Sequence, residues 1–375
     1  MLSALVLAAL AAGCAPKRFE FEPVTVRAAA PAEGGAPVDW SRGPEALFTQ
    51  GWQAYEAGRL SEALAAFRAI VAYYPESAEI GDAAYNAGLI LKRRSEWPEA
   101  ERLFALAGER LPEAKDRLDA DFMRLGCLYE LGQWERTLVA VAEAYSRRAT
   151  LTADDRVELA ARRGAALFHL GRFDEADEEL NQAFGDYRLG LRRGDVVNDY
   201  AGAMAAYYLG RLAGKRFDDA PLSAADTPAD EARLEEKARR LLDAQAWFLK
   251  SVEQNNAYWA TASGYEVGAL YRAFHAALKN APLPDGIASG SEEAQMYACL
   301  LADRSRVLLR KSLHLWERTV EIGERLNAEN AWTAKTKTEM GAVKTLYLAD
   351  EKACAGVVPP DFDDMPAIGR RSIPP

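Results

Sequence analysis

Apolar residues recur at helical spacing along most of the chain, in paired stretches that repeat every 37 to 39 residues. This spacing predicts amphipathic helices rather than strands. The clearest pair, residues 51–75, carries small, aromatic and aliphatic residues in a fixed order closed by a proline: Gly51, Gly58, Ala63, Phe67, Ile70 and Pro75. Gly51 lets the second helix pack closely on the first, and Gly58 opens the turn between them. Because one such hairpin leaves an apolar face uncovered, the pattern predicts a stack of hairpins.

The same order returns along the chain, in copies that start near residues 44, 81, 118, 157 and 196. The second copy keeps Gly88, Ala100, Phe104, Ala107 and Pro112, and the fourth keeps Gly164, Gly171, Phe173, Ala176 and Leu180. The third copy has Thr137 and Val141 in place of the alanine and phenylalanine, and a loop near residues 213–229 interrupts the fifth. The order resembles the tetratricopeptide repeat (TPR), a helix–turn–helix unit of about 34 residues. The resemblance implies an all-α, right-handed solenoid of helical hairpins over residues 44–256.

Residues 257–355 lose this signature but keep helical spacing, which predicts helices over 258–280, 292–326 and 332–353, that is, a longer C-terminal helical hairpin. In the longest helix Leu301, Leu308, Leu315 and Ile322 recur every seven residues. Such a seam predicts a partner helix, either in a coiled-coil dimer or within the same chain. Five prolines over residues 356–375 indicate a disordered tail.

The N-terminus carries a targeting pattern. Residues 2–12 form an apolar run that is too short to span a bilayer, which predicts an export signal. The sequence Leu10-Ala-Ala-Gly-Cys14 resembles the bacterial lipobox, which implies cleavage after residue 13, a covalent lipid on Cys14 and an outer-membrane anchor facing the periplasm. An ordinary secretory signal with a chance cysteine is the alternative. Prolines and small residues over 14–43 predict a flexible tether.

Composition excludes several classes of function. A net charge of −10 and a pI near 5.1 argue against nucleic-acid binding. The three histidines lie far apart, and no phosphate-binding glycine loop or nucleophile elbow is present in the sequence. We therefore expect no enzyme activity, no metal, no cofactor beyond the lipid, and no small-molecule substrate.

The TPR resemblance also implies a partner-binding groove, because the family lines its concave face with fixed positions of each first helix. Carried over one by one, these positions are Phe48, Trp52, Tyr55, Tyr85, Leu89, Lys92, Arg93, Phe122, Tyr129, Phe168 and His169. Exposed aromatic residues suit an extended peptide or a partner helix. The alternative is that these aromatic side chains pack against other parts of the same chain and bind no partner. The lysine and asparagine pattern of chaperone-binding TPR proteins is absent from these positions.

Two cysteines in the C-terminal helices have matching distances from a turn. If the chain reverses near Asn327, Cys299 lies 28 residues before the turn and Cys354 lies 27 after it. An antiparallel hairpin would bring them level, which makes a disulfide between them a hypothesis for an oxidising compartment.

The C-terminal half is similar to TPR lipoproteins of deltaproteobacteria that are associated with adventurous gliding motility. The similarity lies in Tyr258-Trp-Ala, Gly268-Ala-Leu-Tyr, Ala281-Pro-Leu-Pro and Asn330-Ala-Trp. It implies a non-catalytic scaffold that binds protein partners in an envelope machine. Two alternatives stay open, an assembly factor for outer-membrane β-barrels or pilus secretins, and a self-associating structural lipoprotein.

Overall fold

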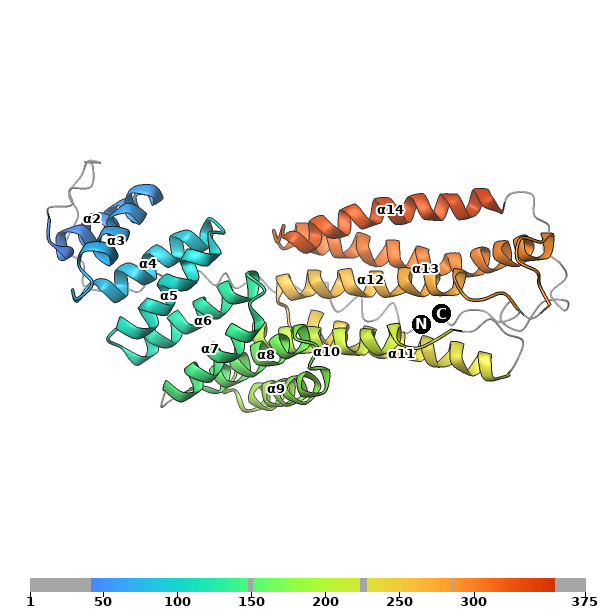
Figure 1. The fold of residues 1–375 in the computed structure, drawn as a ribbon, viewed down its shortest axis with the longest axis horizontal. Coiled ribbons are helices and arrows are strands. Elements are labelled where there is room, and N and C mark those ends of the chain that lie inside the picture. Colours follow the sequence, from blue (N-terminus) through green and yellow to red (C-terminus); the bar gives the residue numbers. More distant parts are fainter. Residues whose placement is uncertain (1–41, 148–150, 223–227, 285, 355–375) are drawn as a thin grey trace. The chain divides into compact units, whose positions relative to one another are not determined.

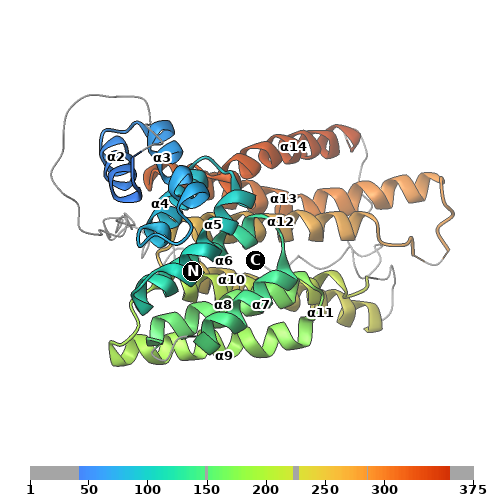
Figure 2. The ribbon, with the colours of Figure 1, turned by 60° about the vertical axis from the view of Figure 1, so that its left-hand side comes forward.

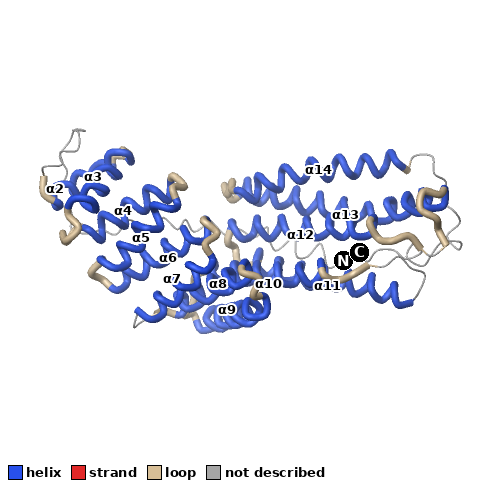
Figure 3. Tube along the Cα trace, in the orientation of Figure 1, coloured by secondary structure: helices blue, strands red, loops and turns tan. Residues whose placement is uncertain are grey.

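The computed structural model describes residues 42–147, 151–222, 228–284 and 286–354. Within these ranges the regular structure is entirely helical, as the tube in Figure 3 shows. The predicted all-α fold of helical hairpins is therefore confirmed. The chain divides into two compact units, unit 1 up to residue 149 and unit 2 from residue 150. The predicted signal, Cys14, nearly all of the tether and the tail lie outside the described residues.

Unit 1 consists of three consecutive helical hairpins (Figure 1): α2 (Pro44–Glu56) with α3 (Leu60–Tyr73), α4 (Ile80–Arg93) with α5 (Trp97–Arg110), and α6 (Ala114–Glu130) with α7 (Trp134–Arg147). Each helix packs on the next along the chain. Phe67 and Phe104, one from each of the first two second helices, are fully buried in one continuous hydrophobic core.

Two positions explain why these hairpins close so tightly. A Cβ atom added to Gly51 would lie 2.7 Å from the Phe67 ring, and one added to Gly88 would lie 2.8 Å from the Phe104 ring. The turn between the helices of a hairpin needs a left-handed residue, which is Gly58 in the first repeat (φ 74°) and Ser95 in the second (φ 61°). The third hairpin also forms, with Thr137 and Val141 both buried.

Unit 2 contains the fourth and fifth hairpins and three long helices: α8 (Ala153–His169), α9 (Phe173–Arg193), α10 (Asp199–Asp218), α11 (Pro228–Val252), α12 (Ala257–Lys279), α13 (Glu292–Arg325) and α14 (Ala331–Ala353). Helix α10 packs on α8, α9, α11 and α12. Helices α12, α13 and α14 run side by side in both Figure 1 and Figure 2. Their bounds lie within one residue of those expected from the sequence.

Two expected boundaries differ from the structure. Helix α10 continues to Asp218, whereas the loop was expected to begin at residue 213. The helix continues because Ala213 and Phe217 are buried, and the Phe217 ring lies edge-on to Phe274 with centroids 5.9 Å apart. The compact units divide near residue 149 rather than at 256, because α12 packs on α10 and α11. The C-terminal helices therefore continue the fourth and fifth repeats.

The buried face of α13 does not follow the seven-residue seam. Leu301 and Leu308 are buried, but Leu315 and Ile322 are only half-buried. Most of the buried positions recur in steps of four, four and three: Tyr297, Leu301, Ser305, Leu308, Ser312, Trp316, Thr319 and Gly323. These steps add up to an 11-residue repeat, whose period is close to that of a straight α-helix. Residues spaced by seven, such as those of the predicted seam, therefore drift gradually around the surface of the helix. Helices α12 and α14 pack on this face. The partner helices of α13 thus come from the same chain, which is the second of the two alternatives given for the seam.

Candidate interaction surface

We call the side of α2, α4 and α6 that carries the predicted groove positions the first-helix face of unit 1. Two of its aromatic residues are less exposed to solvent than the sequence predicted. Phe48 is 8% exposed and Tyr85 is 3% exposed. Phe48 packs on Phe67, and Tyr85 lies edge-on to Phe104 at 5.7 Å between centroids. Both belong to the core, because this position of the first helix points at the phenylalanine of its own second helix.

The other apolar positions of the face remain half-exposed. Trp52 and Tyr55 stack on each other with centroids 5.9 Å apart and 22° between their planes. Leu89 and Phe122 are half-buried. Tyr129 is also half-buried and lies edge-on to Trp134 at 5.3 Å. The face thus offers rigid apolar area to a partner without exposing a hydrophobic core.

Two basic positions, Lys92 and Arg93, lie in the last turn of α4. Lys92 Nζ lies 3.3 Å from Met123 Sδ, which joins α4 to α6. Burial raises the pKa of Glu130 above its usual range, and the charge of Lys92 opposes that rise. Arg93 is exposed.

Carboxylates on this face were missed by the sequence reasoning. One position is acidic in each of the first three repeats, with a spacing of 37 residues: Glu45, Asp82 and Asp119. Asp116 lies in the first turn of α6. The signal was available, since Glu45, Asp82 and Asp119 stand three positions before Phe48, Tyr85 and Phe122. However, Glu45, Asp82 and Asp116 lie in the first turns of their helices, where acids are common for reasons of helix polarity alone.

Carboxylates of α6 influence the ionisation of Tyr85 and Asp82 on α4. Burial, followed by the charges of Asp119 and Asp116, raises the pKa of Tyr85 to about 12. Burial, followed by Asp116 and Glu79, raises the pKa of Asp82 to about 6. Asp82 is 3% exposed, and its Oδ1 has no hydrogen-bond partner in the described chain. Acidic side chains of α4 and α6 therefore lie close together at this end of the face.

We expect Asp82→Asn to stabilise the protein at pH 8 and to have little effect near pH 4. The folded-state pKa of Asp82 is raised, so its ionisation destabilises the fold above about pH 6, and that cost disappears as the pH falls through 6 towards 4. About two pKa units correspond to at most about 3 kcal/mol, which solvent screening reduces to about 1–2 kcal/mol. Urea unfolding at both pH values measures the difference.

The matched control is Glu109→Gln, which removes an exposed carboxylate from the same unit. It should change the free energy of unfolding little at either pH. An Asp82→Asn variant that is equally or less stable than the parent at pH 8 would contradict the assignment.

In unit 2, Phe168 and His169 belong to an aromatic cluster at the end of α8. The Phe168 ring lies 5.6 Å from Phe173 and 5.5 Å from Tyr208 between centroids. The guanidinium of Arg211 lies over Phe168 at 5.2 Å. His169 Nε2 lies 2.9 Å from the Tyr208 hydroxyl, and partial burial with the charge of Arg211 lowers the pKa of His169 to about 4. Most of the Phe168 surface thus contacts the chain itself.

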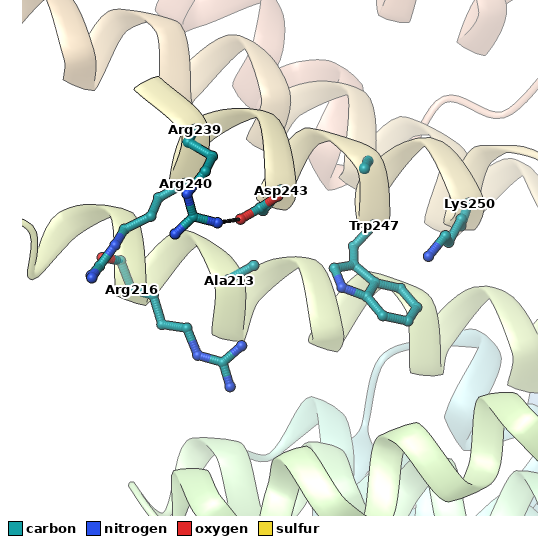
Figure 4. A pocket seen from close by; sticks show the side chains of 8 residues that line it. Ala213, Arg216, Arg239, Arg240, Asp243, Trp247 and Lys250 are labelled. Atoms are coloured by element: carbon teal, nitrogen blue, oxygen red, sulfur yellow. Dashed lines mark hydrogen bonds and ion pairs between the residues drawn. The ribbon is translucent and has the colours of Figure 1, made fainter. Parts of the chain in front are cut away.

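A surface cavity of about 550 Å³ lies between α10 and α11 of unit 2 (Figure 4). Its polar lining consists of Arg216, Arg239, Arg240, Asp243 and Lys250, with the ring of Trp247. Most of these cations are already neutralised: Arg239 bonds to Asp243 at 2.8 Å, Arg240 to Glu236 at 2.7 Å, and Arg216 to Asp177 at 3.2 Å. The cavity therefore offers little net charge to an anionic ligand.

The described ranges contain neither a cluster of metal-ligating residues nor a helix suited to span a membrane. No group of three or more His, Cys, Asp and Glu residues there could hold a metal ion. None of the described helices is both long and apolar enough to cross a membrane. Cys127 is buried in unit 1, whereas Cys299 and Cys354 are half-buried in unit 2.

Comparison with known proteins agrees with the helical repeat. The family model described as tetratricopeptide repeat matches residues 45–77, which contain α2 and α3. Among solved structures, a TPR protein from Bacteroides fragilis is 15% identical, with 62% of this chain and 98% of that chain covered and a TM-score of 0.31. The apo form of RapI is 10% identical over 82% of this chain and 98% of that one, with a TM-score of 0.43. Human IFIT1, solved as a dimer with a capped RNA, is 13% identical over 84% of this chain and 65% of that one, with a TM-score of 0.38.

With such TM-scores these structures carry no argument about function. No protein with a curated description matches the chain. The family match and the hairpins together show a TPR-type helical fold, and no enzyme family is indicated.

Proposed function

We propose that this chain is a non-catalytic scaffold that binds a segment of a protein partner on the first-helix face of unit 1. The observation that supports this most directly is the combination of half-exposed stacked rings, Trp52 and Tyr55, with the carboxylates near Tyr85. Stacked helical hairpins present extended surfaces of this kind. Rigid aromatic rings supply contact area at low entropic cost.

The chemistry of the face favours a partner segment with both apolar and basic side chains. Apolar side chains would pack on Trp52, Tyr55, Leu89 and Phe122. A lysine or arginine would lie near Asp116 and Asp119, where its charge would complement those of the carboxylates. An acidic segment would be repelled at the same place.

We further propose that the chain is anchored in the outer membrane by a lipid on Cys14 and faces the periplasm. The support is the lipobox-like ending at residues 10–14 and the similarity to gliding-motility lipoproteins in the C-terminal half. The partner would then belong to an envelope complex, with the gliding machinery as the first candidate. The alternatives are an assembly factor for β-barrels or secretins, and self-association.

Crosslinking in intact cells tests the docking function. A photoreactive residue replaces Trp52, and a control replaces the exposed Val139 on α7. Capture of a periplasmic or inner-membrane motor component from position 52 but not 139 would support the proposal. Capture of a β-barrel assembly component would favour that alternative, and an internal crosslink alone would show that the chain covers this face itself.

A peptide selection tests the partner chemistry separately. We expect the soluble chain, lacking residues 1–14, to enrich dodecapeptides with lysine or arginine next to aromatic or aliphatic residues from a random library. The double variant Asp116→Asn/Asp119→Asn should bind the selected peptides about tenfold more weakly, and Glu109→Gln should bind them unchanged. Enrichment of acidic peptides would contradict the charge assignment but leave the docking surface in place.

A further inference from the structure

Helices α13 and α14 form an antiparallel hairpin, and the ion pairs between them show its register. The chain reverses at Asn327, which has a φ of 52°. Moving away from this turn, Lys337 Nζ lies 3.2 Å from Glu324, and Lys344 Nζ lies 3.8 Å from Glu317. Further along, Arg306 lies 3.8 Å from Glu351.

The next pair in this register consists of two cysteines. Cys299 lies two helical turns before Arg306, and Cys354 lies just beyond Glu351 at the end of α14. The thiols of Cys299 and Cys354 are hydrogen-bonded to each other. Both side chains are only half-buried, so a solvent-borne reagent can reach them.

We propose that Cys299 and Cys354 form an intramolecular disulfide that closes the open end of the α13–α14 hairpin under oxidising conditions. The oxidant is an external disulfide, either of a thiol–disulfide oxidoreductase or of oxidised glutathione. The thiolate of one cysteine attacks a sulfur of that disulfide, giving a mixed disulfide and releasing one thiolate. The second cysteine then attacks the mixed disulfide and releases the other thiol. The protein loses two protons and two electrons, and the oxidant's disulfide is reduced to two thiols.

The surroundings indicate a structural bond rather than a reactive dithiol. Burial, together with the hydrogen bond to Cys299, raises the pKa of Cys354 to about 11, so its thiolate is scarce at neutral pH. Cys127 has no part in the reaction, since its side chain is fully buried and burial raises its pKa to about 11 as well.

Helix α14 is the element that would gain most from such a bond. It buries few large apolar side chains: Val343 is 1% exposed, but Leu348 is 61% exposed. Its last turn is held by Asp350, which bonds to Lys279 Nζ and lies 3.0 Å from His275 Nε2 on α12. A disulfide at Cys354 would fix this turn independently of those charges, and it would close a loop of about 55 residues.

The experiment uses the purified soluble chain after incubation with oxidised glutathione at pH 8. We expect alkylation under denaturing conditions to label only Cys127, and peptide mass spectrometry to find one link between Cys299 and Cys354. Reduction should lower the midpoint of thermal unfolding by roughly 10 °C. The variant Cys299→Ser/Cys354→Ser should lose this sensitivity to reductant, and Cys127→Ala should keep it.

Three alkylatable thiols after oxidation would overturn the proposal, and so would a link between two chains. A thermal midpoint that is unchanged by reduction of a linked sample would overturn the stabilising role. The inference does not depend on the docking function.

Discussion

Replacing Gly268 by alanine is expected to lower the free energy of unfolding by about 3 kcal/mol. A Cβ atom at this position would lie 2.2 Å from Trp316 Nε1 and 2.5 Å from its Cδ1. The indole is fully buried, and its N–H donates to the Tyr265 carbonyl oxygen at 2.8 Å. The ring must therefore move, which both overpacks the contact between α12 and α13 and breaks a buried hydrogen bond.

The matched control is Gly341→Ala in α14. Both glycines lie within helices, but a Cβ atom at Gly341 would meet nothing within 4 Å. Alanine there should stabilise the protein by about 0.5–1 kcal/mol through helix propensity alone. Urea denaturation followed by far-ultraviolet circular dichroism measures both variants. Equal effects of the same sign would show that α12 and α13 do not approach each other as described.

Replacing Glu101 by glutamine should destabilise unit 1 by about 2–3 kcal/mol at neutral pH. Glu101 on α5 accepts hydrogen bonds at 2.9 Å from Arg124 on α6 and from Arg136 on α7. Its side chain is 6% exposed and that of Arg124 is 16% exposed. Burial lowers the pKa of Arg124, but hydrogen bonds to Glu101 and Glu143 outweigh this and raise it. Glutamine keeps the shape but leaves two guanidinium groups close together with only Glu143 to balance them.

The surface pair Arg68–Glu99 provides the comparison for this variant. Its side chains are 42% and 30% exposed, so Glu99→Gln should cost less than about 1 kcal/mol. Added salt should weaken the surface pair more than the buried one. If Glu101→Gln cost no more than Glu99→Gln, the three-helix network would contribute little to holding the second and third repeats together.

The repeat pattern determined most of the helical structure because its signals are local. Gly51 and Phe67 lie 16 residues apart in one hairpin, so their contact can be read from spacing alone. The same holds for Gly88 and Phe104 in the second hairpin. The third hairpin was recognised despite its substitutions because Thr137 and Val141 still fit buried positions. The long helices α12, α13 and α14 were similarly bounded by their prolines, glycines and caps.

The candidate surface could be predicted only in outline. Spacing placed Phe48, Trp52 and Tyr85 on first helices, but it could not tell which rings would turn inward. Phe48 and Tyr85 are buried against their own second helices, and Trp52 stays half-exposed. Asp82 and Asp116 were overlooked because acids in the first turns of helices are usual. The influence of Asp116 on Asp82, and of Asp116 and Asp119 on Tyr85, depends on the distance between α4 and α6.

By itself, the sequence of this protein determined the helical hairpins, their period and the ends of the long helices, because these depend on interactions within about 35 residues. Only the tertiary structure decided which face of α13 is buried, where the chain divides into units, and how far α10 continues. These features depend on contacts with helices that are distant in sequence, such as Phe217 with Phe274 and Gly268 with Trp316. Packing at such contacts is set by side-chain shape, which the alternation of apolar and polar residues does not record.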